Sequence, residues 1–282
     1  MNAAAHADSV TRFYDSHPIN EEQILAALRA KGVPREAVTE DDLKAFDQDH
    51  YGGVEALEEL ARRAGIARAH HVLDVCSGMG GPARYLAHWL GCRVTGLDLT
   101  ESRYRSAQRL TRLARLEHLV DFRLGNALAM PFPAGSFDAV VAQESWAHIP
   151  DKSRLVGEAA RVLRPEGVLA FTDIVRRDDL PEGTARRLKD GMTFTEIESA
   201  QEYVRLLEVH ACPAVQVDDL SEAWTAILQQ RLAMYRSLKA STSAKFGAAR
   251  YEQYDDAYSF FVSLYERGVL GGVRIVARRR AA

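Results

Sequence analysis

Cysteine is scarce in this sequence. The 282 residues include three cysteines, Cys76, Cys92 and Cys212, which lie far apart. An odd number at such spacing does not predict a disulfide framework, and the close pairs of a zinc site are missing. We therefore expect a protein of a reducing, cytoplasmic compartment that holds no metal.

Long apolar runs and an excess of one charge are also missing. No run of about 18 apolar residues, the length that spans a bilayer, occurs in the chain. Residues 1–20 lack the cationic start and apolar stretch of a signal peptide. The net charge is −3, so no basic field draws the protein to nucleic acid. A small molecule is the expected partner, and a homo-oligomer stays open.

The sequence does contain a regular alternation of apolar runs and amphipathic segments. The apolar runs are separated by stretches with helical spacing, such as 101–116. This order predicts parallel strands with helices on both faces, which right-handed crossovers turn into a doubly wound, Rossmann-like α/β sheet. The predicted strands are 71–75, 92–99, 120–127, 137–143 and 167–174.

The rest of the chain divides around this alternating core. Residues 1–65 are predicted to form an N-terminal helical segment that covers the binding site, and residues 66–282 the main domain. A further strand is expected within 214–220. The main domain consists of a core at 70–175, a cap at about 176–210 and 221–267, and a last strand at about 271–279.

The stretch VLDVCSGMGG, residues 72–81, is an apolar run that ends in a glycine-rich turn before a helix. Such a turn presents backbone N–H groups at the helix N-terminus and lets a ligand approach the backbone closely. Residues 78–83 also fit the dinucleotide pattern G-x-G-x-x-A. Asp98 ends the next strand, where an acid can bind the ribose of NAD and of S-adenosylmethionine alike. The turn by itself leaves both cofactors open.

Three longer segments resemble the ordered motifs of class I S-adenosylmethionine-dependent methyltransferases: 72–100, 125–152 and 161–173. Several motifs in order are more specific than one glycine turn, so the resemblance favours S-adenosylmethionine over NAD. Residues 12–16, 46–53 and 194–210 are similar to N-terminal and cap segments of small-molecule enzymes of the sarcosine/dimethylglycine N-methyltransferase type. In that group the N-terminal segments fold over the cofactor.

The resemblance also implies a set of cofactor-binding residues. The glycine turn would hold the methionine end, Asp98 the ribose, and Leu99 and Asn126 the adenine. Two positions depart from the family: Cys76 stands where glycine is usual, and Asn126 stands where an acid is usual, although its oxygen can still accept a hydrogen bond. The expected residues are Gln48, Tyr51, Asp74, Ser77, Gly78, Gly80, Asp98, Leu99, Asn126, Ala127 and Gln143.

Three side chains are candidates for a catalytic role. His148, Glu144 and Tyr14 could orient the acceptor or remove its proton, which is required where the acceptor arrives protonated. A histidine at a helix start can also have no catalytic role, so both interpretations of His148 stay open.

Other groups have a functional and a structural interpretation. Cap aromatics could bind a methylated ammonium group, but at helical spacing they more often form core. Arginines could bind a substrate carboxylate or lie in solvent. Two carboxylates and a histidine within 46–53 could bind a metal, although such groupings are common by chance. The aromatics are Phe194, Tyr203, Trp224, Tyr235, Tyr251, Tyr254 and Tyr258, and the arginines are Arg84, Arg176, Arg177 and Arg205.

These observations predict methyl transfer from S-adenosylmethionine to a small molecule, with the nitrogen of an amine or amino acid as the favoured acceptor. Within that class, an oxygen, sulfur or carbon of a natural product is the alternative. Outside it, the alternatives are an NAD-dependent oxidoreductase and a non-catalytic protein that keeps the fold.

Overall fold

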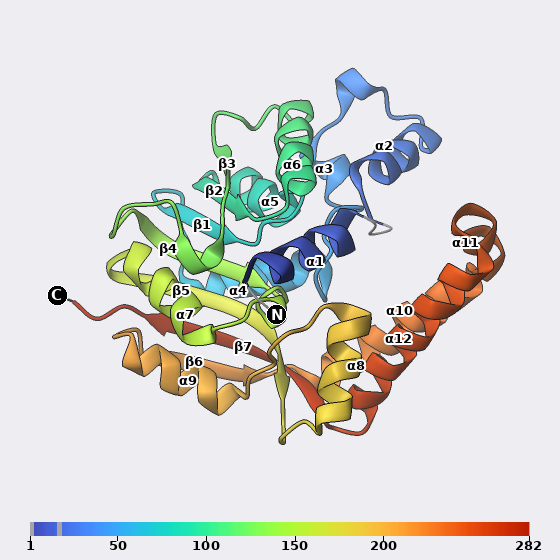
Figure 1. Ribbon diagram of the computed structural model, residues 1–282. Helices are drawn as coiled ribbons and strands as arrows, with labels where there is room; N and C mark the ends of the chain where they lie inside the picture. The colour runs from blue at the N-terminus through green and yellow to red at the C-terminus, as the bar shows by residue number, and fades with distance from the viewer. Residues whose placement is uncertain (1–2, 16–18, 282) are drawn as a thin grey trace.

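The computed structural model describes residues 3–15 and 19–281. Within these residues seven strands form one sheet in the order β3-β2-β1-β4-β5-β7-β6, and β7 runs antiparallel to both of its neighbours (Figure 1). This arrangement confirms the predicted doubly wound α/β sheet. The strands are β1 (His71–Val75), β2 (Arg93–Asp98), β3 (Val120–Leu124), β4 (Phe137–Gln143), β5 (Leu163–Arg176), β6 (Ala214–Asp219) and β7 (Leu270–Arg278).

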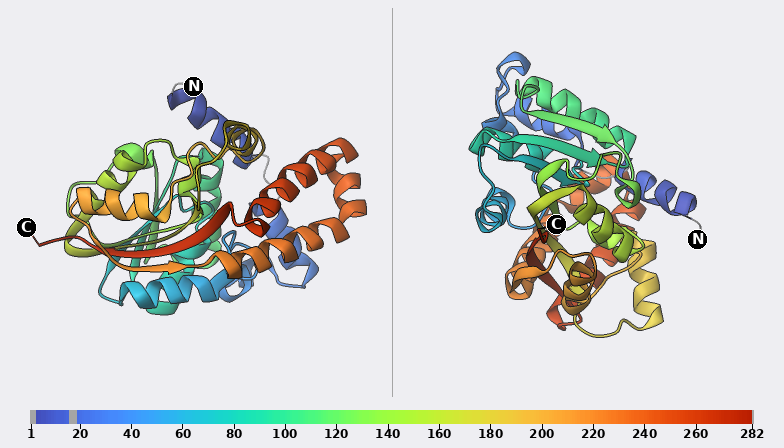
Figure 2. Two further views of the ribbon diagram at one scale, coloured as in Figure 1. Left: turned by 90° about the horizontal axis from the view of Figure 1, so that it is seen from below. Right: turned by 90° about the vertical axis from the view of Figure 1, so that its left-hand side faces the viewer.

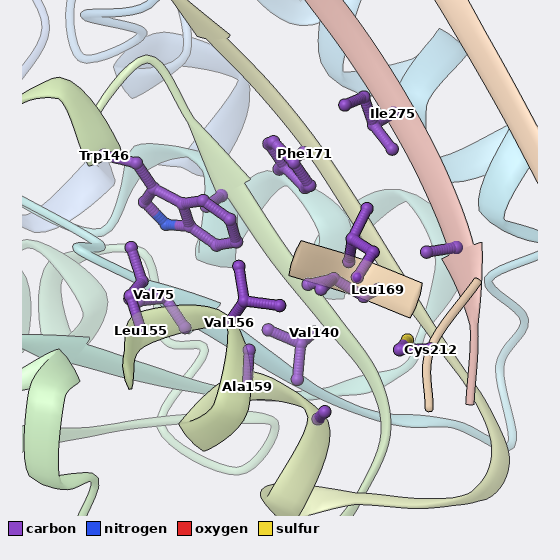
Figure 3. Packing of buried hydrophobic residues seen from close by; sticks show 14 of the residues in the cluster. Val75, Val140, Trp146, Leu155, Val156, Ala159, Leu169, Phe171, Cys212 and Ile275 are labelled. Carbon is purple, nitrogen blue, oxygen red and sulfur yellow. The ribbon is translucent and has the colours of Figure 1, made fainter. Parts of the chain in front are cut away.

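Helices cover both faces of the sheet because its strands are apolar on both sides. On one face, Trp146 stacks on Phe171 of β5 with ring centroids 4.2 Å apart, next to Val140 of β4 and Leu155 (Figure 3). On the other face, buried residues such as Leu57 pack against the opposite sides of the same strands. The first face is covered by α7 (Lys152–Val162) and α9 (Ala200–Val209), and the second by α4 (Gly53–Ala64), α5 (Gly81–Leu90) and α6 (Glu101–Leu113).

Two helices belong more closely to the sheet than the predicted boundaries imply. The prediction assigns α4 to the N-terminal segment, yet Leu57 and Leu60 are fully buried in the core of the second face. It assigns α9 to the cap, yet Tyr203 and Leu207 are fully buried against the first face. Each helix carries an apolar stripe that the sheet covers.

A helical arm, residues 221–266, projects from the sheet edge (Figures 1 and 2). Its base is fixed where Trp224 lies on Gly272 of β7: a Cβ atom at position 272 would be 2.3 Å from the indole, so the close approach requires glycine. Leu188 and Phe261 share the apolar cluster at this base. The arm consists of α10 (Ser221–Ser237), α11 (Lys239–Phe246) and α12 (Ala248–Glu266), and α8 (Glu182–Met192) lies beside it.

The N-terminal helices are attached to α6. Arg103 donates one hydrogen bond to the carbonyl oxygen of Ile19 at 2.8 Å and another to that of Tyr14 at 3.1 Å. Arg109 forms an ion pair with Glu21. These contacts hold α1 (Ala3–Asp15) and α2 (Glu21–Ala30) near the carboxyl ends of the strands, followed by the short α3 (Glu40–Leu43). In the part of the chain that the structure describes, no helix has the length and apolarity needed to cross a membrane.

Candidate active site

Three neighbouring cavities lie at the carboxyl ends of the strands. The β2 cavity and the β1 cavity, named here for the strands that end in them, each measure about 110 Å³. The arm cavity, between the end of β4, α1 and the helical arm, measures about 660 Å³. Tyr14 of α1 lines all three, so the cavities meet at this side chain.

The β2 cavity contains the residues predicted for ribose and adenine. Asp98 is held by two backbone groups, because its carboxylate oxygens accept N–H bonds from Gly78 and Thr100, both at 2.8 Å. Burial raises the pKa of this carboxyl. Leu99 is 37% exposed and presents an apolar surface, and the Asn126 amide oxygen accepts the N–H of Leu128 at 2.8 Å. Leu99, Asn126 and Ala127 all line this cavity.

The β1 cavity is bordered by polar atoms without a hydrogen-bond partner in the described part of the protein. They are Oδ2 of Asp74, Oγ of Ser77 and Oε1 of Gln143, and all three residues line the cavity. Burial, followed by the nearby Asp98 carboxylate, raises the pKa of Asp74 to about 7. Buried polar atoms normally have partners, so this set indicates a preformed site for a polar or cationic ligand group.

A chain of hydrogen bonds determines how Gln143 faces the β1 cavity. The Gln48 amide nitrogen donates to Asp47 at 3.2 Å, which turns the Gln48 oxygen toward Nε2 of His50 at 2.9 Å. Nε2 therefore carries the proton, and Nδ1 accepts from the Gln143 amide nitrogen at 3.0 Å. Burial lowers the pKa of His50 to about 4, which keeps this tautomer neutral. The Gln143 oxygen consequently remains available to a ligand.

Two non-glycine residues at adjacent strand ends have left-handed backbones. Cys76 follows β1 with φ at 62°, and Glu144 follows β4 with φ at 45°. Both line the β1 cavity. A non-glycine residue with a left-handed backbone destabilises the fold by about 1–2 kcal/mol. Such strain persists where the surroundings enforce it, often at functional sites. At position 76 the structure thus requires the conformation that glycine adopts most readily.

The glycine turn is attached to the N-terminal segment through Arg84 of α5. This fully buried guanidinium forms ion pairs with Asp47 and with Glu40, the latter at 3.1 Å, and donates to the carbonyl oxygen of Met79 at 2.7 Å. A Cβ atom at Gly81 would lie 2.3 Å from the Asp47 carbonyl oxygen, so the segment lies directly on the helix start. Arg84 is therefore engaged within the protein and does not bind a substrate carboxylate.

Tyr14 and His148 form a pair between the β2 cavity and the arm cavity. The Tyr14 hydroxyl lies 3.1 Å from Nε2 of His148, and Nδ1 of His148 lies 2.9 Å from the Thr193 hydroxyl. That hydroxyl donates its proton to the carbonyl oxygen of Met192 at 2.6 Å, so it accepts the Nδ1 proton. In neutral His148 the lone pair is therefore on Nε2, toward Tyr14 and the cavities. This geometry supports the catalytic interpretation of His148.

Glu144 joins the N-terminal segment to the sheet. Its carboxyl oxygens accept the backbone N–H of Tyr51 and the hydroxyl of Thr172, each at 2.6 Å. Burial raises the pKa of this carboxyl to about 8. Glu144 lines both the β1 cavity and the arm cavity, so it stands where the two meet.

Three residues predicted to bind the cofactor lie elsewhere. Gln48 and Tyr51 line the arm cavity, because the Glu144 and His50 contacts turn this segment toward the arm. Gly80 lines none of the three cavities; its place is structural, since a Cβ atom there would lie 2.5 Å from the Phe122 ring. The other predicted residues line the β1 or the β2 cavity.

The arm cavity has a predominantly aromatic and apolar wall. Of the cap aromatics, Phe194, Tyr235, Tyr254 and Tyr258 line it, whereas Tyr203 is in the sheet core. Within the described residues, its carboxyl and guanidinium side chains are Asp49, Glu144 and Arg231. The cap arginines predicted as candidates for a substrate carboxylate, Arg176, Arg177 and Arg205, do not line this cavity. Arg176 forms ion pairs with Asp179 and Glu198, and Arg205 forms one with Glu202.

Known methyltransferases resemble this chain in sequence and in fold. A family model described as a methyltransferase domain matches residues 73–171. The methyltransferase GfsG of Streptomyces halstedii is 34% identical over 184 residues, which are 64% of this chain and 66% of that protein. A sarcosine/dimethylglycine N-methyltransferase of Halorhodospira halochloris is 38% identical over 137 residues, 49% of this chain and 48% of that protein.

Residues 73–171 form a methyltransferase domain. The predicted family resemblance is thereby confirmed. The chain spans about half to two-thirds of the length of the two relatives. A crystal structure of a Galdieria sulphuraria protein matches with a TM-score of 0.75 and 20% identity, covering 81% of this chain and 85% of that one, which shows a shared fold.

S-adenosylmethionine is the cofactor of this family, and the residues of the methyltransferase domain fit it. The unpaired oxygens of Asp74 and Gln143 suit the ammonium of a methionine end. Asp98 retains lone pairs for ribose hydroxyls, and the exposed face of Leu99 suits a flat adenine ring.

Sequence reasoning did not identify several residues that shape the site. Thr193 fixes the tautomer of His148, Arg103 holds α1 over the cavities, and Arg231 lies in the arm cavity. Arg231 is distant in sequence from the family segments, whereas Arg103 and Thr193 stand just outside the segments 72–100 and 194–210. Each of the three acts through contacts that only the folded chain creates. The aromatic spacing of the cap was the one available signal for the arm cavity.

Proposed function

We propose that this chain transfers the methyl group of S-adenosylmethionine to a small molecule bound in the arm cavity. The observation that supports this function is the junction of the three cavities at Tyr14, with Glu144 shared by the β1 and arm cavities. When bound, S-adenosylmethionine supplies an activated methyl group on a positively charged sulfur. The protein then has to hold the acceptor in line and exclude water, which the enclosing α1 and arm support.

His148 is the residue we assign to proton removal. Its Nε2 lone pair faces the cavity junction, and the bond from Nδ1 to Thr193 holds the ring in that orientation. The Tyr14 hydroxyl contacts Nε2 itself, at 3.1 Å, so a proton from the acceptor reaches His148 through Tyr14. A base in this place is needed for an acceptor whose nucleophilic atom still carries its proton at neutral pH.

The nature of the acceptor atom stays a prediction. The nitrogen acceptor follows from the resemblance and from the name of the Halorhodospira relative; Asp49 and Glu144 are the carboxyls near which an ammonium could lie. A hydroxyl acceptor is the second candidate. It is favoured by the Thr193 contact, which takes the Nδ1 proton of His148 and turns Nε2 toward the cavities as the accepting nitrogen. It is also favoured by the raised pKa of Glu144, about 8, which leaves that carboxyl largely protonated at neutral pH.

Calorimetry tests the cofactor assignment. S-adenosylhomocysteine should bind, and NAD should not; binding of NAD alone would support the oxidoreductase alternative instead. Asp98→Asn should weaken S-adenosylhomocysteine binding by about tenfold or more, because it removes the charge that attracts ribose hydroxyls. Asp178→Asn, which changes an exposed carboxyl outside the cavities, is the matched control.

Transfer itself is tested with S-adenosylmethionine labelled in the methyl group and a panel of amines, amino acids, phenols and alcohols. Mass spectrometry of the product identifies the methylated atom. Tight cofactor binding with no transfer to any acceptor would favour the non-catalytic alternative. A cytoplasmic location, the absence of nucleic-acid binding and a homo-oligomeric state also stay predictions.

A further inference from the structure

The arm cavity is far larger than a free amino acid requires. Its volume is about 660 Å³, six times that of either cofactor-side cavity. Pockets of about 300–1,000 Å³ hold ligands of drug size. An amino acid such as sarcosine, only several times larger than a water molecule, would leave most of this space without contacts.

The chemistry of the wall is equally unsuited to a zwitterion. Most of its lining is apolar or aromatic, and Arg231 is the sole guanidinium among the described lining residues. That guanidinium donates to the His50 carbonyl oxygen at 2.6 Å and lies over the Tyr51 ring, 4.9 Å from its centroid. It therefore holds the N-terminal segment against the arm. A carboxylate that enters this cavity would lose its hydration and gain few hydrogen bonds or ion pairs in return.

Four tyrosines of the arm pack on one another, and Tyr235, Tyr254 and Tyr258 among them line the arm cavity. Tyr235 stacks on Tyr251 with centroids 4.9 Å apart and planes 5° apart, and Tyr254 stacks on Tyr258 at 5.7 Å and 13°. Tyr235 and Tyr254 also touch, with centroids 4.8 Å and planes 52° apart, so the two stacks are tilted against each other. The packed rings form an extended aromatic wall suited to an apolar ring or chain, whereas a cage for ammonium arranges rings around a point.

Apolar side chains continue this wall into solvent. Met234 is 59% exposed, Leu238 50% and Phe246 39%, and all three line the arm cavity. Exposed apolar groups gathered at the rim of a cavity commonly mark a ligand or partner site. A ligand that reaches them extends beyond the enclosed part of the cavity toward the tip of the arm.

We propose that the methyl acceptor is a bulky, largely apolar molecule that carries a hydroxyl nucleophile and lies along the aromatic wall of the arm. This inference rests on the proposed function. The acceptor O–H proton passes to the Tyr14 oxygen while the Tyr14 hydroxyl proton passes to Nε2 of His148, 3.1 Å away. The acceptor oxygen forms its bond to the methyl carbon, and the sulfur keeps the electron pair of the broken sulfur–carbon bond.

The test compares probes of graded size on the protein saturated with S-adenosylhomocysteine. Calorimetry with phenol, 2-naphthol, estradiol and sarcosine should give dissociation constants that fall by about tenfold or more from phenol to estradiol, in proportion to the apolar surface buried. Sarcosine should bind more weakly than phenol. Tighter binding of sarcosine, or no binding of 2-naphthol and estradiol, would overturn the inference.

A charge at the rim provides a second test. Met234→Arg should weaken estradiol binding by about tenfold while changing phenol binding by less than about twofold, since phenol does not reach the rim. Ala233→Arg adds the same charge at an exposed neighbour outside the lining and should change neither. Equal effects of the two variants on estradiol binding would contradict a ligand that reaches the rim of the arm cavity. Failure of S-adenosylhomocysteine to bind would instead refute the proposed function, which separates the two outcomes.

Discussion

Tyr14 and His148, 134 residues apart in sequence, lie 3.1 Å apart between their hydroxyl and Nε2 atoms. Their rings also meet edge to face, with centroids 5.5 Å apart. This contact joins α1 to the loop after β4 at the junction of the three cavities. Docking of the N-terminal helix therefore completes the site and at the same time orients its candidate base.

His148→Ala should lower the turnover number by about 10²–10⁴-fold, the usual contribution of a positioned base. The dissociation constant for S-adenosylhomocysteine should change little, because the cofactor-side carboxylates remain. Rates are measured with labelled methyl transfer to the best acceptor of the panel. Added imidazole should restore part of the rate by occupying the space that the truncation leaves; a variant with full activity and no response to imidazole would show that His148 is structural.

Cys76→Gly should stabilise the protein by about 1 kcal/mol, because glycine adopts the left-handed backbone at φ 62° without the steric cost that cysteine bears. The change is measured as a rise in the midpoint of urea unfolding at constant slope. Cys92→Gly is the control: Cys92 is fully buried and outside the left-handed region, so this variant should be destabilised. A loss of stability in both variants would mean that packing of the Cys76 sulfur outweighs the strain.

The family motifs predicted the sheet, and most of the residues proposed for the cofactor line the β1 or the β2 cavity because local patterns position them. Asp74 lies near the end of β1, Asp98 is the last residue of β2, and Asn126 comes shortly after β3, so their place at the carboxyl edge follows from the topology. The tautomer of His148 could not be predicted in this way. It depends on Thr193, which a separate element brings into contact.

The N-terminal segment illustrates the same limit. Gln48 and Tyr51 were expected on the cofactor, yet Glu144 and Arg231 hold that loop at the arm cavity. Neither contact has a signature in the spacing of residues. The size and aromatic character of the arm cavity likewise arise from segments that meet only in the folded chain, among them α1, α8 and the three helices of the arm.

Glu144 predicts a pH dependence of stability. Its carboxyl has a pKa raised from 4.5 to about 8, so between these values the folded protein holds a proton that the unfolded chain has released. Its contribution to the free energy of unfolding therefore falls as the pH rises from about 4.5 to about 8. Glu144→Gln removes this term, and the stability of the variant relative to the wild type should increase across that window and level off above it.

Urea unfolding at a series of pH values measures this difference. Glu117→Gln changes an exposed carboxyl and is the matched control, for which the difference from the wild type should not grow over the same window. A pH-independent difference for Glu144→Gln would contradict the raised pKa.

Arg84→Met should destabilise the protein by about 3–5 kcal/mol, since it leaves the buried carboxylates of Asp47 and Glu40 without their cation. Arg62→Met removes ion pairs of a side chain that is 55% exposed and should cost less than about 1 kcal/mol of stability.

Asp47 also orients Gln48, the first member of the hydrogen-bond chain that ends at Gln143. Arg84→Met should therefore weaken S-adenosylhomocysteine binding under conditions where the variant is still folded, and Arg62→Met should not. Calorimetry of both variants measures their affinity for S-adenosylhomocysteine. Unchanged affinity in Arg84→Met would show that the hydrogen bonds from Gln48 to Gln143 form without the buried ion pairs.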